Sequence, residues 1–199
     1  MHYIELLTAT RIDGLYSPGT GKTSTIVESI VQLVRRDAGV RILACTPNDA
    51  AANVLVERLA AAGLDSDELF QLNASSHYED MPEDMQISPP IPGYKKLLAF
   101  RVMLSTCSSA AILRALDVPA AHFSHIVIDD ATQAQEPLVM IPIMTFANAR
   151  TNVILTGDPN PLGPVVKSPT ASKGGLGMSY LQRLMLMREV YGHHTQAST

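Results

Sequence analysis

The stretch YSPGTGKT, at positions 16–23, contains residues whose types and spacing could bind phosphate. Gly21, Lys22 and Thr23 match the end of the pattern G-x-x-x-x-G-K-[ST], in which backbone N–H groups and the lysine hold nucleotide phosphates. Tyr16 stands where the pattern has its first glycine, outside the set of N–H donors. A phosphate-binding loop is the favoured interpretation, and a glycine-rich start of a helix is the alternative. The residues expected to bind nucleotide are Pro18, Gly19, Thr20, Gly21, Lys22, Thr23 and Ser24.

Two acids end the apolar stretch HIVIDD, at positions 125–130. In a strand that ends this way beside a phosphate loop, the first acid holds Mg²⁺ through water and the second orients the attacking water. Asp129 and the hydroxyl of Thr23 are therefore the expected magnesium ligands. Asp130 is the expected catalytic residue. An aspartate pair that caps the next helix is the alternative interpretation.

A third segment, NVILTGDPNPLGPV at positions 152–165, runs from an apolar stretch into Gly157 and Asp158. By itself it is typical of any strand followed by a turn. It follows the phosphate loop and the acidic pair along the chain. An acid at the end of this strand would lie at the same edge of the sheet as those two motifs.

Short apolar stretches alternate along the chain with helical patterns. Such alternation predicts an α/β fold with a mainly parallel sheet and helices on both of its faces. The expected strands are Val40–Thr46, Glu68–Asn73, Phe100–Thr106, His125–Asp130 and Asn152–Asp158. The expected helices are Thr23–Arg36, Asp49–Ala62 (with Gly63 as the residue that ends it), Ser108–Leu116 and Met178–Arg188.

The suspected functional residues fall at the carboxyl ends of the expected strands. In open α/β sheets, ligands bind along that edge. The sequence therefore predicts that Thr46-Pro47, Asp129-Asp130 and Gly157-Asp158 gather on one side of the sheet.

Composition indicates one globular domain. The 199 residues are 46% hydrophobic, enough for a substantial core, and residues 74–93, rich in Ser, Pro and acids, are expected to form a surface loop. The net charge is −4, but seven acids lie in the Lys- and Arg-free stretch 65–84, which leaves 15 − 12 = +3 elsewhere. Charge thus neither demands nor excludes a nucleic-acid partner.

The location expected from the sequence is the cytoplasm. The N-terminal residues have no basic segment followed by an apolar run, as a signal peptide would, and no stretch approaches the roughly 20 apolar residues that span a bilayer. Cys45 and Cys107 are far apart in apolar stretches and are expected to be buried, reduced thiols.

The series of motifs resembles superfamily 1 helicases of the nonsense-mediated-decay type, and most of all the RNA-silencing helicases of the Armitage kind. The resemblance extends over about residues 15–190. The stretches that carry it, besides the phosphate loop, are VRILACTPNDAAANVLVERL, HIVIDDATQAQEPL, LTGDPNPLGPVVKSP and GLGMSYLQRLM.

The resemblance implies a RecA-like nucleotide-binding domain, the first of two such domains in the motor, with ATP and Mg²⁺ as its cofactors. The chain is expected to be one such domain over residues 1–199, incomplete at both ends. Single-stranded nucleic acid, RNA rather than DNA, is the implied partner. The positions that resemble family contacts to its backbone are Thr46, Pro47, Ser105 and Thr106. Hydroxyl groups that bind the local backbone at strand ends are the alternative explanation for these residues.

Three departures from the family pattern predict weak hydrolysis, and a fourth is unfavourable for contact with nucleic acid because Asp49 adds a negative charge near its phosphates. Tyr16 replaces a glycine, Asp130 a glutamate and Pro161 a glutamine similar to a γ-phosphate sensor, while Asn48-Asp49 replaces Ser-Asn. An aspartate is one methylene shorter than a glutamate, and an error of about 1 Å in position can cost about 100-fold in rate. The expected function is an ATP-binding helicase motor domain with weak or absent hydrolysis in isolation. The alternative is a catalytically degenerate nucleotide- or RNA-binding remnant or scaffold. A small-molecule kinase is disfavoured because arginines for a lid are too few.

Overall fold

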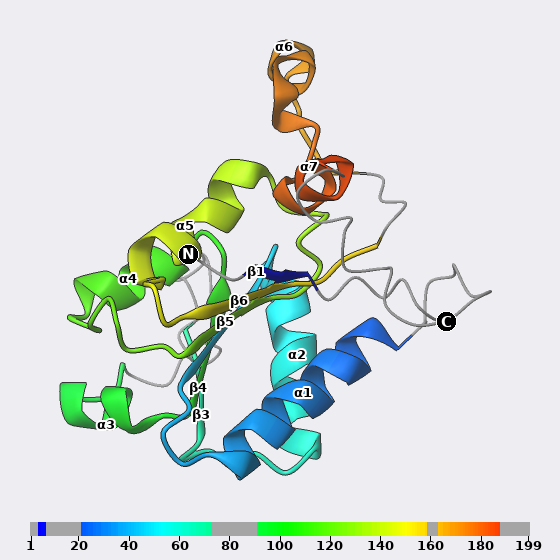
Figure 1. Cartoon of the computed structure of the whole chain (residues 1–199). Coiled ribbons are helices and arrows are strands. Elements are labelled where there is room, and N and C mark those ends of the chain that lie inside the picture. Colours follow the sequence, from blue (N-terminus) through cyan, green and yellow to red (C-terminus); the bar gives the residue numbers. More distant parts are fainter. Residues whose placement is uncertain (1–3, 7–20, 73–90, 159–162, 188–199) are drawn as a thin grey trace, which may run out of the picture.

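One parallel sheet organises the molecule (Figure 1). The computed structural model describes residues 4–6, 21–72, 91–158 and 163–187. All neighbouring strands in the sheet run parallel, in the order β1-β6-β5-β2-β4-β3. The strands are β1 (Ile4–Leu6), β2 (Ile42–Thr46), β3 (Leu69–Gln71), β4 (Val102–Thr106), β5 (His125–Ile128) and β6 (Asn152–Leu155).

The five strands expected from the sequence are confirmed, but β5 and β6 end earlier than predicted. Strand β5 ends at Ile128, so Asp129 and Asp130 lie in a turn, and β6 ends at Leu155. For β5 the reason is that Asp130 adopts a left-handed backbone conformation (φ 51°), which a strand cannot contain. The short edge strand β1 was not predicted.

Helices follow most strands and cover both faces of the sheet, as predicted. They are α1 (Lys22–Arg36), α2 (Asp49–Ala61), α3 (Tyr94–Ala99), α4 (Ala110–Ala115), α5 (Glu136–Phe146), α6 (Pro169–Ala171), the π-helix η3 (Ser172–Leu176) and α7 (Tyr180–Leu186). Gly63 ends α2 with φ +95°, as expected for the residue after a helix C-cap. The expected loop 74–93 lies mostly outside the described residues, and its described end, 91–93, is irregular.

Alternating side chains of each strand divide the core into two layers. Ile42 and Ala44 of β2 point to the layer formed with α1 and α2, while Leu43 and Cys45 point to the layer formed with α4, α5 and α7. This is the period-2 pattern of a strand buried on both faces. It explains why the strands read as continuous apolar runs in the sequence.

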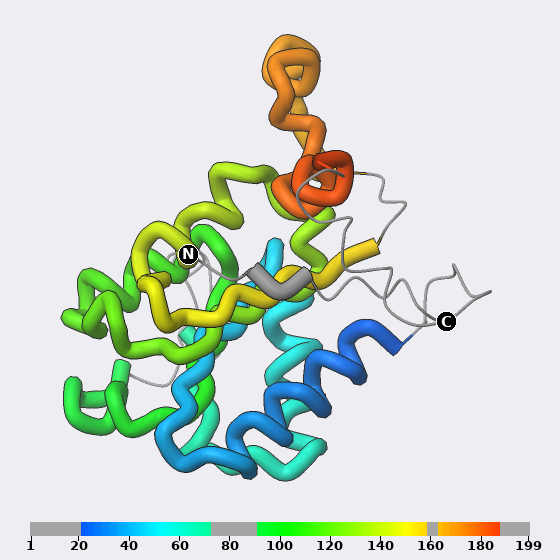
Figure 2. The backbone as a smooth tube through the Cα atoms, in the orientation of Figure 1, coloured from blue at the N-terminus to red at the C-terminus, as the bar shows by residue number. Residues whose placement is uncertain are grey.

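The segment from α6 to α7 lies at one end of the molecule, beyond the start of α5 (Figure 2). Helix α6 projects away from the sheet, whereas α7 returns to it and buries Tyr180, Leu181 and Leu184. Within the described ranges, no helix combines the length and the apolar character needed to cross a bilayer.

Candidate nucleotide-binding site

The candidate site forms where the start of α1 meets the carboxyl ends of β5 and β6. These two strands are neighbours in register, with Ile128 opposite Leu155, so the residues that follow them lie side by side. Lys22, the first residue of α1, places its Nζ atom 3.9 Å from Oδ2 of Asp158. The structure therefore brings together three motifs that the sequence predicted to share one edge of the sheet.

Asp129 is held rigidly at the end of β5. Its carboxylate is buried (6% exposed), and Oδ1 accepts hydrogen bonds from the Thr156 hydroxyl at 2.8 Å and from the backbone N–H of Asp130 at 3.0 Å. Two donors on one oxygen fix the orientation of the carboxylate. The sequence gives no sign of Thr156, which directly follows the neighbouring strand β6, because only the pairing of the two strands reveals the contact.

Asp130 is half-buried in the turn that follows Asp129. Its Oδ2 atom accepts a hydrogen bond from Nε2 of Gln133 at 3.3 Å. Burial raises the pKa of Asp130 above its ordinary value, and the charges of Asp129 and Asp158 raise it further, while Lys22 opposes them. A raised pKa makes this carboxylate easier to protonate, and that property is common among groups at functional sites.

The start of α1 has several features that are favourable for an anion. Gly21 is its N-cap with φ +81°, a conformation that favours glycine, and no side chain caps the helix. The first N–H groups of a helix have no partner within it, and the first turn of α1 contains no acid that would compete with a bound anion. Thr23 is half-buried and Ser24 exposed at this end. Pro18, Gly19 and Thr20, which complete the predicted set, lie outside the described residues, as does Tyr16.

The carboxylates fit a magnesium ion that is shared with a nucleotide. No cluster of three or more metal-binding side chains (His, Cys, Asp or Glu) occurs among the residues that the structure describes. Mg²⁺ in phosphate-transfer sites is usually held by one or two protein ligands, with waters and phosphate oxygens completing the shell. Asp129, with one oxygen fixed by donors, and the hydroxyl of Thr23 match this sparse requirement.

Gly157 lies where three segments of the chain converge. A Cβ atom at this position would lie 2.7 Å from both Oγ1 and Cγ2 of Thr132, and 2.9 Å from Cδ2 of Leu181 on α7. Thr132 also accepts a hydrogen bond from the backbone N–H of Asp158 at 3.2 Å. Only a glycine therefore allows the acidic turn, the end of β6 and α7 to pack this closely. Thr132 is a second residue that the sequence analysis missed.

The residues predicted to contact nucleic acid share the same edge of the sheet, on β2 and β4. Thr46 is opposite Thr106 in the register, and Ser105 lies one position earlier. The hydroxyl of Thr46 donates to the backbone oxygen of Asn48 at 2.9 Å, and Oγ1 of Thr106 accepts from the N–H of Ser109 at 3.1 Å. Both bonds join a side-chain hydroxyl to the backbone a few residues away, which is the alternative explanation given above for these residues.

The side chains of Thr46 and Ser105 are fully buried, and Pro47 is half-buried. Asp49, one of the departures from the family pattern, is the exposed first residue of α2, where a negative charge favours the helix. Contact with nucleic acid at these positions remains a prediction.

A pocket of about 510 Å³ lies beside this edge, between α5, η3 and α7. Its lining residues are Glu136, Pro137, Met140, Gly174, Gly175, Leu176, Met178 and Arg183. Of the residues predicted to bind nucleotide, the four that the structure describes, residues 21–24, do not line it. The pocket and the candidate nucleotide site are therefore separate features, connected by the segment from Asp130 to Glu136.

Comparison with known proteins agrees with these motifs. A family model described as an AAA domain matches residues 6–81 and 93–169. The helicase mov-10-B.1 of Danio rerio is 38% identical over 184 residues, which cover 87% of this chain and 18% of that protein. The RNA helicase armi of Drosophila melanogaster is 33% identical, with 84% of this chain and 16% of that protein covered.

A more distant relative is a homologue of regulator of nonsense transcripts 1 from Arabidopsis thaliana. It is 27% identical, with 85% of this chain and 16% of that protein covered. The chain thus spans less than a fifth of the length of each of these three relatives.

Proposed function

Because the chain belongs to the AAA-domain family of superfamily 1 helicases, with relatives of the Mov10 and Armitage kind, we propose that it is the ATP-binding first motor domain of an RNA helicase-like protein. The family membership and the RecA-like α/β fold confirm what the sequence motifs predicted. The proposal has three further parts: the domain binds ATP and Mg²⁺, it acts on RNA, and it works in RNA silencing in the cytoplasm.

The convergence of Asp130 and Asp158 on Lys22, at the start of α1, is the observation that supports nucleotide binding. In the proposed complex, the N–H groups at this helix end and the Lys22 ammonium bind the phosphates. Asp129 and Thr23 hold Mg²⁺, which neutralises phosphate charge when it is bound. The three motifs come from separate parts of the chain, and the parallel sheet brings them to one edge, where a single ligand can contact all of them.

Hydrolysis in this proposal is weak. In this proposal Asp130 orients the attacking water, but it is one methylene shorter than the glutamate it resembles, and an error of about 1 Å in position can cost about 100-fold in rate. In addition, the proposed motor draws an arginine from a second domain, a contribution worth roughly 10³–10⁵ in rate.

Thermal unfolding with and without nucleotide tests the binding site. A ligand that binds only the folded state raises Tm, and ligand at about 100 times its Kd stabilises by about 2.7 kcal/mol. We expect MgADP and MgATP to raise the Tm of the wild type, and Lys22→Ala to abolish most of that rise. The matched control is Lys173→Ala, which removes an exposed lysine of η3 and is expected to leave the rise unchanged. Unchanged Tm values with both nucleotides would refute the proposal.

A second candidate function is a nucleotide- or RNA-binding module that does not hydrolyse ATP. The replacements at Tyr16, Asp130 and Pro161 favour it, because all three depart from the catalytic pattern of the family. ATP turnover with and without single-stranded RNA, for the wild type and for the double variant Asp130→Glu, Pro161→Gln, separates the two candidates. Turnover in the wild type supports a working motor domain, whereas turnover in the double variant alone supports the non-hydrolysing module.

A further inference from the structure

The turn that carries Asp130 is attached to the fold at both of its ends. At its start, the N–H of Ala131 donates to the backbone oxygen of Thr156 at 2.6 Å, next to the Thr132–Gly157 contact. At its end, Gln135 forms a bridge with Ser179, the N-cap of α7, and Nε2 of Gln135 donates to the backbone oxygen of Val165 at 3.2 Å.

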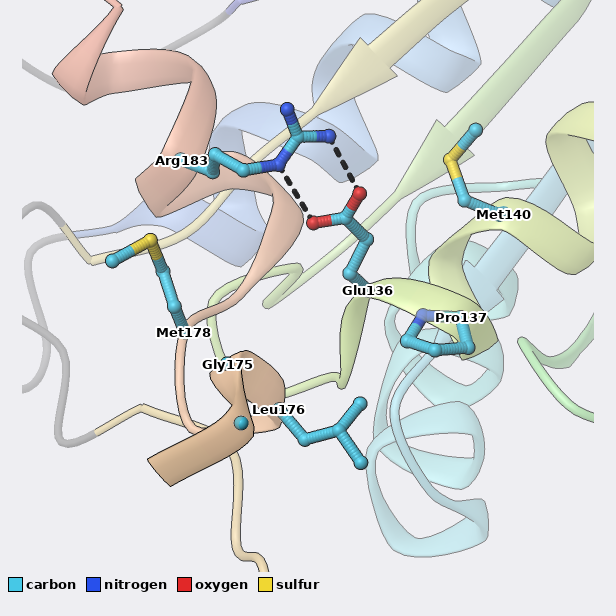
Figure 3. Close-up of a pocket in the computed structure, with 8 residues that line it drawn as sticks. Glu136, Pro137, Met140, Gly175, Leu176, Met178 and Arg183 are labelled. Carbon is cyan, nitrogen blue, oxygen red and sulfur yellow. Dashed lines mark hydrogen bonds and ion pairs between the residues drawn. The ribbon is translucent and has the colours of Figure 1, made fainter. Parts of the chain in front are cut away.

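The last attachment is a bidentate ion pair between helices α5 and α7. Nε of Arg183 donates to Oε2 of Glu136 at 2.8 Å, and Nη2 of Arg183 donates to Oε1 (Figure 3). Bidentate arginine–carboxylate pairs are the most geometrically specific of the charged contacts, because both groups are planar. Met140, Leu176 and Met178 line the pocket beside this pair, whose side chains are about one-third exposed (39% for Arg183 and 32% for Glu136).

The backbone of Asp130 needs such restraint. A non-glycine residue with positive φ is held in a sparsely populated conformation, which persists only when the surrounding structure determines it. The hydrogen bond from the N–H of Gln133 to the backbone oxygen of Asp130, at 2.8 Å, closes the turn around this residue. Anchors at both ends of the turn therefore decide where the carboxylate lies.

We propose that Glu136 and Arg183 are positioning residues, which hold the Asp129–Asp130 turn in its site-forming conformation by clamping its far end to α7. The part of this inference that concerns nucleotide rests on the proposed function. The part that concerns the turn stands on the contacts alone. Neither residue is among those expected to bind the phosphates, and both act through the turn.

Hydrogen–deuterium exchange tests the clamp without any nucleotide. The variants are Glu136→Gln, Arg183→Met, which keeps the length of the stem, and the reversed pair Glu136→Arg with Arg183→Glu. We expect the amides of Ala131 and Gln133 to exchange about three- to tenfold faster in the single variants, since a partly exposed pair contributes modestly to local stability. The reversed pair is expected to restore slow exchange.

The matched control is Arg35→Met. It breaks another ion pair, 3.7 Å from Arg35 to Glu68, far from the turn, and is expected to leave exchange at Ala131 and Gln133 unchanged. If circular dichroism shows that a single variant does not fold, Arg183→Lys is used in its place. Lysine keeps the positive charge and loses the second hydrogen bond to Glu136. Exchange within about twofold of the wild type in folded variants of the pair would overturn the proposal.

Nucleotide titration adds a readout that a purely structural role would not change. Fluorescent ADP is titrated with Mg²⁺ and with a chelator. We expect the single variants to keep the Kd measured without Mg²⁺, which depends on Lys22 and α1, and to lose part of the gain from Mg²⁺, which depends on Asp129. The reversed pair is expected to restore that gain.

If the single variants bind ADP more weakly by the same factor with and without Mg²⁺, a positioning role for the pair is contradicted. If the wild type binds no ADP at all, the proposed function fails. The exchange measurement then decides the clamp by itself.

Discussion

Lys22 and Asp158 form an ion pair across the candidate site, with Nζ of the lysine 3.9 Å from Oδ2 of the aspartate. The lysine begins α1 and the aspartate follows β6, so the pair connects the phosphate-loop motif with the Gly157-Asp158 motif. The lysine side chain is 19% exposed and the aspartate side chain 47%. An incoming phosphate must compete with this carboxylate for the ammonium group.

The change Asp158→Asn is predicted to tighten nucleotide binding. It removes both the competition for Lys22 and a negative charge that repels phosphate. Because the aspartate is partly exposed, the expected gain is small, about two- to fivefold in Kd at low salt and less at high salt. Titration with fluorescent ADP at two salt concentrations measures it. Weaker binding by the variant would show that Asp158 assists the ligand instead.

The change Gly157→Ala is predicted to destabilise the fold by about 1–3 kcal/mol, as expected for overpacking in a core. The added methyl would lie 2.7 Å from atoms of Thr132 and 2.9 Å from Leu181, and these side chains belong to two separate segments. Urea unfolding measures the loss. Gly174→Ala is the control, because a Cβ there meets no atom within 4 Å, and its cost is expected to stay near zero. Similar midpoints for both variants would contradict the close packing.

The change Thr156→Val is predicted to disturb Asp129. It removes the hydroxyl that donates to Oδ1 of Asp129 at 2.8 Å, in a buried position. A hydrogen bond to a charged group contributes about 1.5–3 kcal/mol, so urea unfolding should show a loss of that order. The Mg²⁺-dependent part of ADP binding should fall as well.

The control for this prediction is Thr151→Val, at the opposite end of β6. It removes a buried hydroxyl that donates to the backbone oxygen of Phe123 at 3.2 Å. This variant should lose stability and keep its response to Mg²⁺. An equal loss of that response in both variants would refute a specific role for Thr156.

The change Asp130→Asn is predicted to stabilise the protein increasingly as pH rises. The folded-state pKa of Asp130 is raised, so the folded state binds more protons than the unfolded state between the ordinary value of 3.8 and the raised value. The free energy of unfolding of the wild type therefore falls as pH rises through that window, because ionised Asp130 is disfavoured in the fold. Asparagine removes this charge and also tolerates positive φ.

Urea unfolding of the wild type and Asp130→Asn, at several pH values from 3 to 8, measures the effect. The difference in the free energy of unfolding should grow across the window above 3.8 and then level off. Asp37→Asn is a suitable control, since Asp37 is exposed and far from the site. A difference for Asp130→Asn that is constant with pH would contradict the raised pKa.

The elements that the sequence predicted correctly are those with a clear period or a clear signal at their ends. Helix α1 repeats Ile26, Ile30 and Val34 on its buried face, and Gly63 marks the end of α2. The sequence analysis missed α5, which is apolar on nearly every side and contains Pro142, and α3, which has only six residues. A hydrophobic period needs polar residues between the apolar ones, and α5 has almost none.

The local chemistry follows from the order of residues along the chain: a lysine after a glycine-rich loop, acids at strand ends and an α/β alternation of elements. Which of these residues meet depends on the packing of the folded chain. The pairs Lys22–Asp158, Thr156–Asp129 and Arg183–Glu136 depend on β6 lying beside β5 and on α7 returning to that edge. Strand order is hard to read from sequence because buried parallel strands are all similar apolar runs, which do not distinguish one neighbour from another. Strand order is set by how whole layers of side chains pack, and no single segment of the sequence records it.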